Sequence, residues 1–113
     1  MRKGLVIAAA LVVVAGVAGC GKSDADKQRE MDVNLKLLGE KYIKAKLKDP
    51  SSAEFRNQFI GIKGAPCGEV NSKNSFGGFT GFQRYIVAGK DMAVTAQDMA
   101  PGEFETSWSQ ICR

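Results

Sequence analysis

The chain opens with a short apolar segment and continues as a polar sequence in which several hydrophobic periods follow one another. Residues 5–18 carry no charged side chain, and Arg2 and Lys3 precede them. A positive start followed by an apolar run of this length is typical of an export signal. The run is shorter than the roughly 20 apolar residues that a membrane-spanning helix needs. The pattern therefore predicts export, and leaves open whether the segment is cleaved or kept as an anchor.

A helical period replaces the apolar run between Arg29 and Lys48. Apolar side chains recur there at spacings of four and three residues, which places one set on a single helix face: Met31, Leu35, Leu38, Tyr42 and Ala45. A second set lies around the other side: Val33, Leu37, Ile43 and Leu47. Either the helix is buried broadly against a sheet, or the second face meets a partner or a second copy.

A corner follows the predicted helix at residues 49–54. Pro50 ends the helix before it, and Asp49 can cap a new turn that has Pro50 in its first position. Ser51 and Glu54 have the spacing of a capping box. We expect a single helical turn here, with capping rather than nucleophilic roles for the serines.

The second half of the chain has the composition of β-strands. Aromatic and β-branched residues predict four of them: residues 55–63, 67–73, 82–88 and 92–97, the last two as a hairpin. Asn57 and Gly61 interrupt the first strand and predict a bulge or an edge. Phe104, Trp108 and Ile111 predict a short C-terminal helix, with a strand as the alternative. The expected fold class is α+β, with one N-terminal helix packed on a small antiparallel sheet.

The apolar run ends in Val17-Ala18-Gly19-Cys20, which resembles the lipobox of bacterial lipoproteins. In that family the cysteine thiol receives a diacylglycerol, and the signal is cut just before the cysteine. The resemblance implies a signal peptide at 1–19, lipidation of Cys20, a polar lipidated tether at 20–28 and one domain at 29–113. Gly21 stands where many enterobacterial lipoproteins of the inner membrane have aspartate. The expected location is therefore the cell envelope, anchored in the outer membrane and facing the periplasm.

If Cys20 carries lipid, Cys67 and Cys112 remain as a pair. Disulfides persist in oxidising compartments, so a Cys67–Cys112 disulfide that joins the C-terminus to the domain is the simple expectation. The competing interpretation is a metal site or a catalytic thiol. The chain contains no histidine, which excludes Cys–His chemistry and zinc sites of the Cys/His type.

Charge and motifs exclude several functional classes. The formal net charge is +4, and Arg2 and Lys3 of the predicted signal supply half of it. A charge this small, without a DNA- or RNA-binding motif, argues against a nucleic-acid partner. The sequence has no GxSxG and no Gly-Lys phosphate loop, and Glu103 and Glu105 are poorly spaced for an acid–base pair. We expect no catalytic residue, metal or cofactor. A cell-wall enzyme that uses isolated Asp and Glu brought together in space is the alternative.

One segment suggests more than packing, from Asn71 to Phe82. Its glycines allow sharp bends, and its aromatic and polar side chains predict a binding loop for sugar, peptide or protein: Asn71, Lys73, Asn74, Phe76, Phe79 and Phe82. The alternative is a long hairpin whose three phenylalanines fold inward and complete a small core.

The segments KDPSSAEFRN and CGEVNSKNSFGGFTGFQRYI together resemble small exported or phage-associated bacterial proteins of unknown role. The resemblance covers Leu47 to Ile86 and implies a single small α+β domain, without an activity. The expected function is that of a lipid-anchored binding module whose partner is an envelope protein or glycan. A phage-derived lipoprotein that excludes superinfecting phage, or one that inhibits a wall-degrading enzyme, is the alternative within this class.

Overall fold

The computed structural model describes residue 21 and residues 23–113, so the predicted signal peptide 1–19 and Cys20 lie outside the described residues. The elements follow one another as α2 (Asp24–Lys44), η1 (Pro50–Ser52), β1 (Glu54–Ile60), β2 (Pro66–Asn71), β3 (Gln83–Gly89), β4 (Met92–Thr95), η2 (Ala96–Asp98) and α3 (Pro101–Ile111). The strands form one antiparallel sheet in the order β1-β2-β3-β4. The predicted α+β class is confirmed. None of the described helices is long and apolar enough to cross a membrane.

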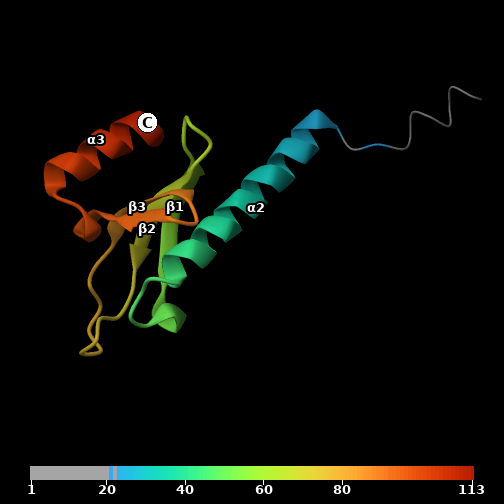
Figure 1. Cartoon of the computed structure of the whole chain (residues 1–113). Helices are drawn as coiled ribbons and strands as arrows, with labels where there is room; N and C mark the ends of the chain where they lie inside the picture. The colour runs from blue at the N-terminus through green and yellow to red at the C-terminus, as the bar shows by residue number, and fades with distance from the viewer. Residues whose placement is uncertain (1–20, 22) are drawn as a thin grey trace, which may run out of the picture.

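The sheet lies between two helices, with α2 on one face and α3 on the other (Figure 1). Because successive side chains of a strand point to opposite faces, β3 contributes side chains to the hydrophobic clusters on both sides of the sheet. Tyr85 and Val87 belong to the cluster beneath α2, while Ile86 between them joins Phe104 of α3. The domain thus has two small hydrophobic clusters, one on each side of the sheet.

Helix α2 begins five residues earlier than the sequence predicts and ends four residues earlier. The hydroxyl of Ser23 accepts a hydrogen bond from the Asp26 amide at 3.2 Å, and Asp24 and Asp26 lie in the first turn, where negative charge suits the helix dipole. Residues 24–28, predicted as tether, are therefore helical. At the other end, i→i+3 hydrogen bonds turn the chain after Lys44, as in the bond from the Leu47 amide to the Lys44 carbonyl at 3.1 Å.

The buried side of α2 differs from the predicted face. Its closest contact with the sheet is made by Gly39, which the hydrophobic period did not include. Gly39 and Ile43 are buried, whereas Met31 and Leu38 of the predicted face are exposed. A Cβ atom on Gly39 would lie only 2.6 Å from Cβ of Pro66, so the missing side chain lets α2 approach β2. The N-terminal half of α2 extends past the sheet (Figure 1). Met31 and Val33 in this half are each 54% exposed.

Strand β1 contains the predicted bulge and is an edge strand. Asn57 has φ +52°, and the register with β2 shifts by one residue between Arg56 and Phe59. Two consecutive side chains, Arg56 and Asn57, consequently bond the same carboxylate oxygen of Glu69, at 2.8 and 2.7 Å. Because of the extra residue, the side chains after the bulge point to the opposite face of the sheet from the one that regular alternation would give. Phe55 packs on the α2 side and Phe59 on the α3 side.

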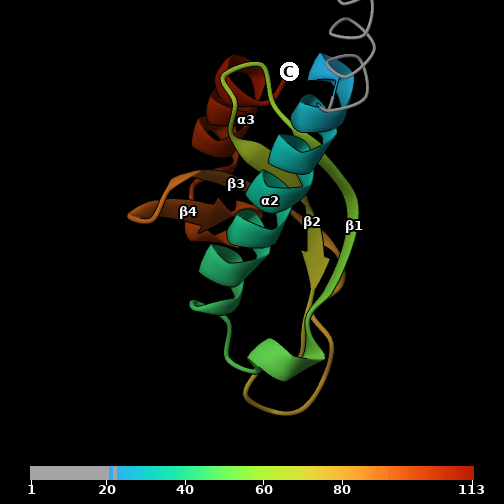
Figure 2. The same cartoon turned by 90° about the vertical axis from the view of Figure 1, so that its right-hand side faces the viewer.

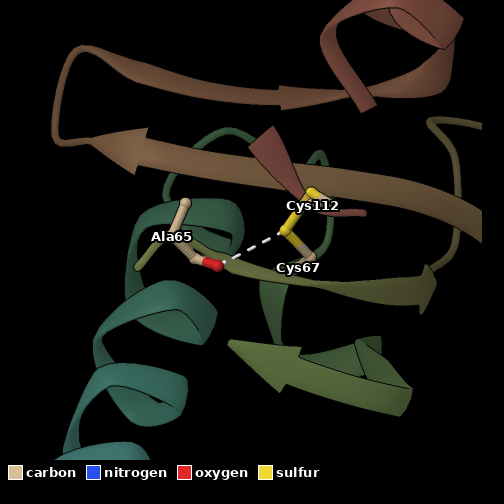
Figure 3. The surroundings of a disulfide bond; sticks show 3 residues. All are labelled: Ala65, Cys67 and Cys112. Carbon is tan, nitrogen blue, oxygen red and sulfur yellow. Dashed lines mark hydrogen bonds between the residues drawn. A yellow bond between two sulfur atoms is a disulfide. The ribbon is translucent and has the colours of Figure 1, made fainter. Parts of the chain in front are cut away.

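The C-terminal segment is a helix, so the strand alternative is wrong. Cys112 follows α3 directly and forms the predicted disulfide with Cys67 of β2, with a Cα–Cα distance of 6.2 Å (Figure 3). The bonded sulfur of Cys67 also lies 3.3 Å from the Ala65 carbonyl oxygen. Because a disulfide sulfur carries no proton, this is a close contact and not a hydrogen bond. The disulfide attaches α3 to the centre of the sheet.

The corner contains the predicted turn but not the predicted capping box. Residues Pro50–Ser52 form a single 3₁₀ turn, with the Ser51 hydroxyl donating to the Asp49 carboxylate at 2.8 Å. Glu54 instead begins β1, and its carboxylate accepts from the Asn71 side chain at 3.2 Å. A complete capping box occurs at Thr95 and Asp98, where sequence analysis did not expect one.

Candidate functional site

The loop between β2 and β3, residues 72–82, is held by its own hydrogen bonds. The Asn74 side chain accepts from the amides of Phe76 and Gly78, at 2.9 and 3.2 Å. The Asn71 side chain accepts from the Gly81 amide at 3.0 Å. Two of the candidate ligand-binding residues, Asn71 and Asn74, therefore shape the loop. Gly77 and Gly81 take positive φ, which permits its two sharp bends.

The three phenylalanines of the loop have three different environments. Phe76 is 96% exposed at the tip, so the alternative in which all three fold inward is wrong for this residue. Phe79 is 50% exposed, and the Lys73 ammonium lies 5.6 Å from the centre of its ring. Phe82 is partly buried, and the central carbon of the Arg56 guanidinium lies 3.7 Å from the centre of its ring. Phe76 is thus the most exposed aromatic side chain of the loop, and Phe79 is the second.

A pocket of about 340 Å³, lined mostly by polar residues and called the polar pocket below, lies between this loop, the segment after α2 and η2. Its walls come from four separate parts of the chain: Lys46, Leu47 and Lys48; Ser72, Lys73, Asn74, Ser75, Phe76 and Thr80; Gln83; and Thr95, Gln97 and Asp98. Lys73, Asn74 and Phe76 of the predicted loop line it, whereas Asn71, Phe79 and Phe82 do not. Sequence reasoning missed the lysines after α2 and the two glutamines, because nothing in the local pattern ties them to the loop.

One wall of this pocket is fixed by Asp98. Its carboxylate accepts from the Thr95 amide at 2.8 Å and forms an ion pair with Lys46, whose ammonium also donates to the Ala93 carbonyl at 2.8 Å. Burial alone would raise the pKa of Asp98, but the hydrogen bonds from Lys46 and Thr95 outweigh it and lower the pKa. The side chain stays ionised at neutral pH and holds Lys46 in place.

A second hollow, on the α3 side, is lined by arginine and aromatic side chains. Arg84 pairs with Glu105 and lies 5.2 and 4.9 Å from the ring centres of Phe104 and Trp108. Glu69, which accepts from Arg56 and Asn57, lines the same hollow of about 290 Å³. The hydrogen bond from Arg56 lowers the pKa of Glu69, and the hydrogen bond from Asn57 adds to it. Arg113 also lines the hollow, with its guanidinium 4.7 Å from the ring centre of Phe59. Because Arg84 and Glu69 are both paired, we assign this hollow a structural role.

The exposed apolar side chains of α2 form a third surface. Of the second predicted face, Ile43 and Leu47 pack against the sheet, while Val33 and Leu37 are 54% and 57% exposed. On the other side, Leu35, Leu38 and Tyr42 border an apolar groove of about 380 Å³ that reaches Pro66 and Ile111. The sequence left open that this second face meets a partner. Of its four residues, only Val33 and Leu37 are exposed enough to do so.

The two carboxylates considered from the sequence as an acid–base pair, Glu103 and Glu105, lie in the C-terminal helix α3. Glu105 bonds Arg84. Across residue 21 and residues 23–113, no group of three or more His, Cys, Asp or Glu side chains could hold a metal ion.

No family model, curated protein or solved structure matches the chain. Fold and site together define a small disulfide-linked α+β domain with a loop-bordered polar pocket. The pocket is therefore the feature of the described residues that bears most directly on function.

Proposed function

We propose that this protein is a lipid-anchored binding module of the cell envelope, held in the outer membrane through Cys20 and facing the periplasm. The binding site is the pocket between the β2–β3 loop and η2. The observation that carries the proposal is Phe76, which is 96% exposed at the rim of a polar pocket. Aromatic residues, phenylalanine among them, are enriched at protein interfaces relative to the rest of the surface.

The order within the loop supports binding. Its turns are fixed by Asn71 and Asn74 and by a hydrogen bond from the Thr80 amide to the Ser72 carbonyl at 3.0 Å. A ligand that docks on a preformed loop loses less conformational entropy than one that must order it. The partner is an envelope glycan or protein that fits a polar pocket with one aromatic rim.

The position of the pocket also supports an anchored protein. The β2–β3 loop and the N-terminus of α2 lie at opposite ends of the molecule in both views (Figures 1 and 2). A 21-residue helix is about 30 Å long. An anchor attached ahead of α2 would leave the pocket open to a partner.

Co-sedimentation of the protein without its lipid, made from residue 20 onward with Cys20→Ser, with purified peptidoglycan and with outer-membrane vesicles tests the binding site; the lipid is left out because it would carry the protein into vesicles by itself. We expect the protein to sediment with one of them, and Phe76→Ala to weaken binding about tenfold or more. Ile62→Ala is the matched control, because Ile62 is a 68% exposed apolar residue in the β1–β2 connection. Equal binding by the Phe76 variant and the unmodified protein, or no binding to either material, would contradict the proposal.

A further inference from the structure

We infer that the pocket beside Phe76 binds an anionic sugar, with its carboxylate or phosphate held between Lys48 and Lys73. This inference rests on the proposed function and names the ligand class of that site. Three features support it: the charges that line the pocket, the side chains there that have no partner within the described residues, and the loop amides that already form hydrogen bonds within the loop.

The pocket carries more positive charge than its own carboxylate neutralises. Lys46, Lys48 and Lys73 line it together with one acidic residue, Asp98. Asp98 is occupied by Lys46 and by Thr95. Within the described residues, neither Lys48 nor Lys73 forms an ion pair. A negatively charged ligand group would supply the missing partner for both.

Lys73 is oriented without being neutralised. Its amide donates to the Ser52 hydroxyl at 2.8 Å, which fixes its backbone, and its ammonium lies 5.6 Å from the Phe79 ring centre. A cation over an aromatic face keeps its full charge. The ammonium thus remains able to bind an anion.

The neutral groups of the pocket suit the hydroxyls of a sugar. Gln83 accepts from the Gln97 amide at 3.2 Å through its side-chain oxygen, while its NH₂ group and the whole Gln97 side chain make no hydrogen bond within the described residues. Side-chain amides both donate and accept, as a row of hydroxyl groups requires. The exposed ring of Phe76 offers an apolar face to the C–H side of a sugar ring.

An acidic peptide fits less well, because the loop has little free backbone to pair with it. The amides of Phe76 and Gly78 bond Asn74, the Asn74 amide bonds the Gly78 carbonyl at 2.8 Å, and the Thr80 amide bonds the Ser72 carbonyl at 3.0 Å. Peptides that add a strand to a protein need such groups unpaired. Ligand recognition here falls to side chains, as in a sugar site.

Calorimetric titration of the full mature protein tests the inference with defined probes. The probes are trigalacturonic acid, its neutral methyl ester, glucose 6-phosphate and triglutamate. We expect the acid or the phosphate to bind, and the double variant Lys48→Gln, Lys73→Gln to lose about tenfold or more in affinity, since charge-assisted hydrogen bonds are removed. Binding by the acid alone points to a carboxylate ligand, and binding by the phosphate alone to a phosphorylated one. Lys90→Gln, a change of an exposed lysine between β3 and β4, serves as the matched control and leaves the affinity unchanged.

The outcomes separate this inference from the proposed function. If the ester binds as tightly as the acid and Phe76→Ala weakens both, the anion site is wrong while the binding module stands. Binding of triglutamate without either sugar would replace the sugar with an acidic peptide. If none of the probes binds at about 10 mM, the inference is overturned. Phe76-dependent sedimentation with envelope material would then still support the proposed function.

Discussion

Gly39 shows how a single missing side chain positions the long helix. Glycine within a helix costs roughly 1 kcal/mol relative to alanine, so its presence needs a reason. Here Pro66 of β2 occupies the space that a Cβ atom would take, at 2.6 Å. Gly39 therefore gives up local helix stability so that α2 can contact the sheet.

Gly39→Ala should destabilise the domain although it improves helix propensity. The helix and Pro66, at the buried N-terminal end of β2, would have to move apart, and overpacking of this kind costs about 1–3 kcal/mol. Urea unfolding followed by circular dichroism measures the change. Gly102→Ala in α3 is the control, because a Cβ there meets nothing within 4 Å and should leave stability unchanged or raise it by up to about 1 kcal/mol. A Gly39 variant as stable as the unmodified protein would refute the close-contact explanation.

Glu69 should make stability depend on pH in the acidic range. Its hydrogen bonds from Arg56 and Asn57 lower its pKa below the ordinary value of 4.5. A depressed carboxylate pKa gives stability that is fully present above that value and is lost as pH falls through the folded-state pKa. Melting temperatures measured from about pH 6 to about pH 3 should therefore fall less steeply for Glu69→Gln. Asp91→Asn, in the exposed β3–β4 turn, should follow the unmodified protein; equal slopes for all three proteins would contradict the prediction.

Residue patterns predicted some of these details and not others. Asn57 tolerates positive φ and interrupts the alternation of β1, so the bulge could be located from the sequence. The period of α2 instead favoured Met31 and Leu38, because glycine carries no hydrophobic signal even when it makes the closest contact. Which face of a helix is buried depends on where the sheet ends, and local periodicity contains no information on that.

At the scale of elements, α3 depends on its attachment to the sheet. The helix has only 11 residues and buries Phe104 as its single fully covered apolar side chain. Helices this short are marginal alone in water. The Cys67–Cys112 disulfide supplies a second attachment point at the end of α3, where Trp108 and Ile111 pack against the same cluster.

Replacing both Cys67 and Cys112 by alanine should lower stability by about 4 kcal/mol, the chain-entropy value for a loop of this length. The helix should also separate from the sheet before the rest unfolds. Trp108 is the only tryptophan, so its fluorescence reports the α3 region, while circular dichroism reports the whole domain. An early red shift of the fluorescence relative to the circular dichroism signal is expected. Coincident transitions within about 1 kcal/mol of the unmodified protein would refute this role of the disulfide.

Elements were easier to predict than the site they form. Strand composition and the turns at glycine gave four strands close to those observed, and the spacing of Phe104, Trp108 and Ile111 gave α3. The pocket, by contrast, needs Lys48, Lys73 and Gln97 to meet across the end of the sheet. These three residues come together because of the order of the strands in the sheet and the turn after α2. No sequence motif indicates either feature.

At the scale of the whole molecule, the early start of α2 bears on the predicted lipid anchor. The helix begins at Asp24, so the predicted tether of residues 20–28 contracts to the four residues ahead of it. Four residues span at most about 14 Å. If Cys20 carries the lipid, α2 starts close to the membrane surface and its own length provides the separation between membrane and pocket.

Intact mass of the membrane-extracted protein tests the anchor and the disulfide together. The expected mass is that of a chain starting at Cys20 with attached acyl chains, because one chain alone binds a membrane only marginally and stable anchoring takes at least two. Reduction should add the mass of two hydrogen atoms, since the Cys67–Cys112 disulfide is the one such bond within the described residues. Cys20→Ser is the control and should keep its signal segment and lack lipid. A mass that includes residues 1–19, or an unmodified Cys20, would contradict the lipoprotein proposal. The location of the protein in the cell would then have to be explained in another way. The charges of the pocket and the exposure of Phe76 do not depend on the anchor, so the binding proposal would remain open to its own test.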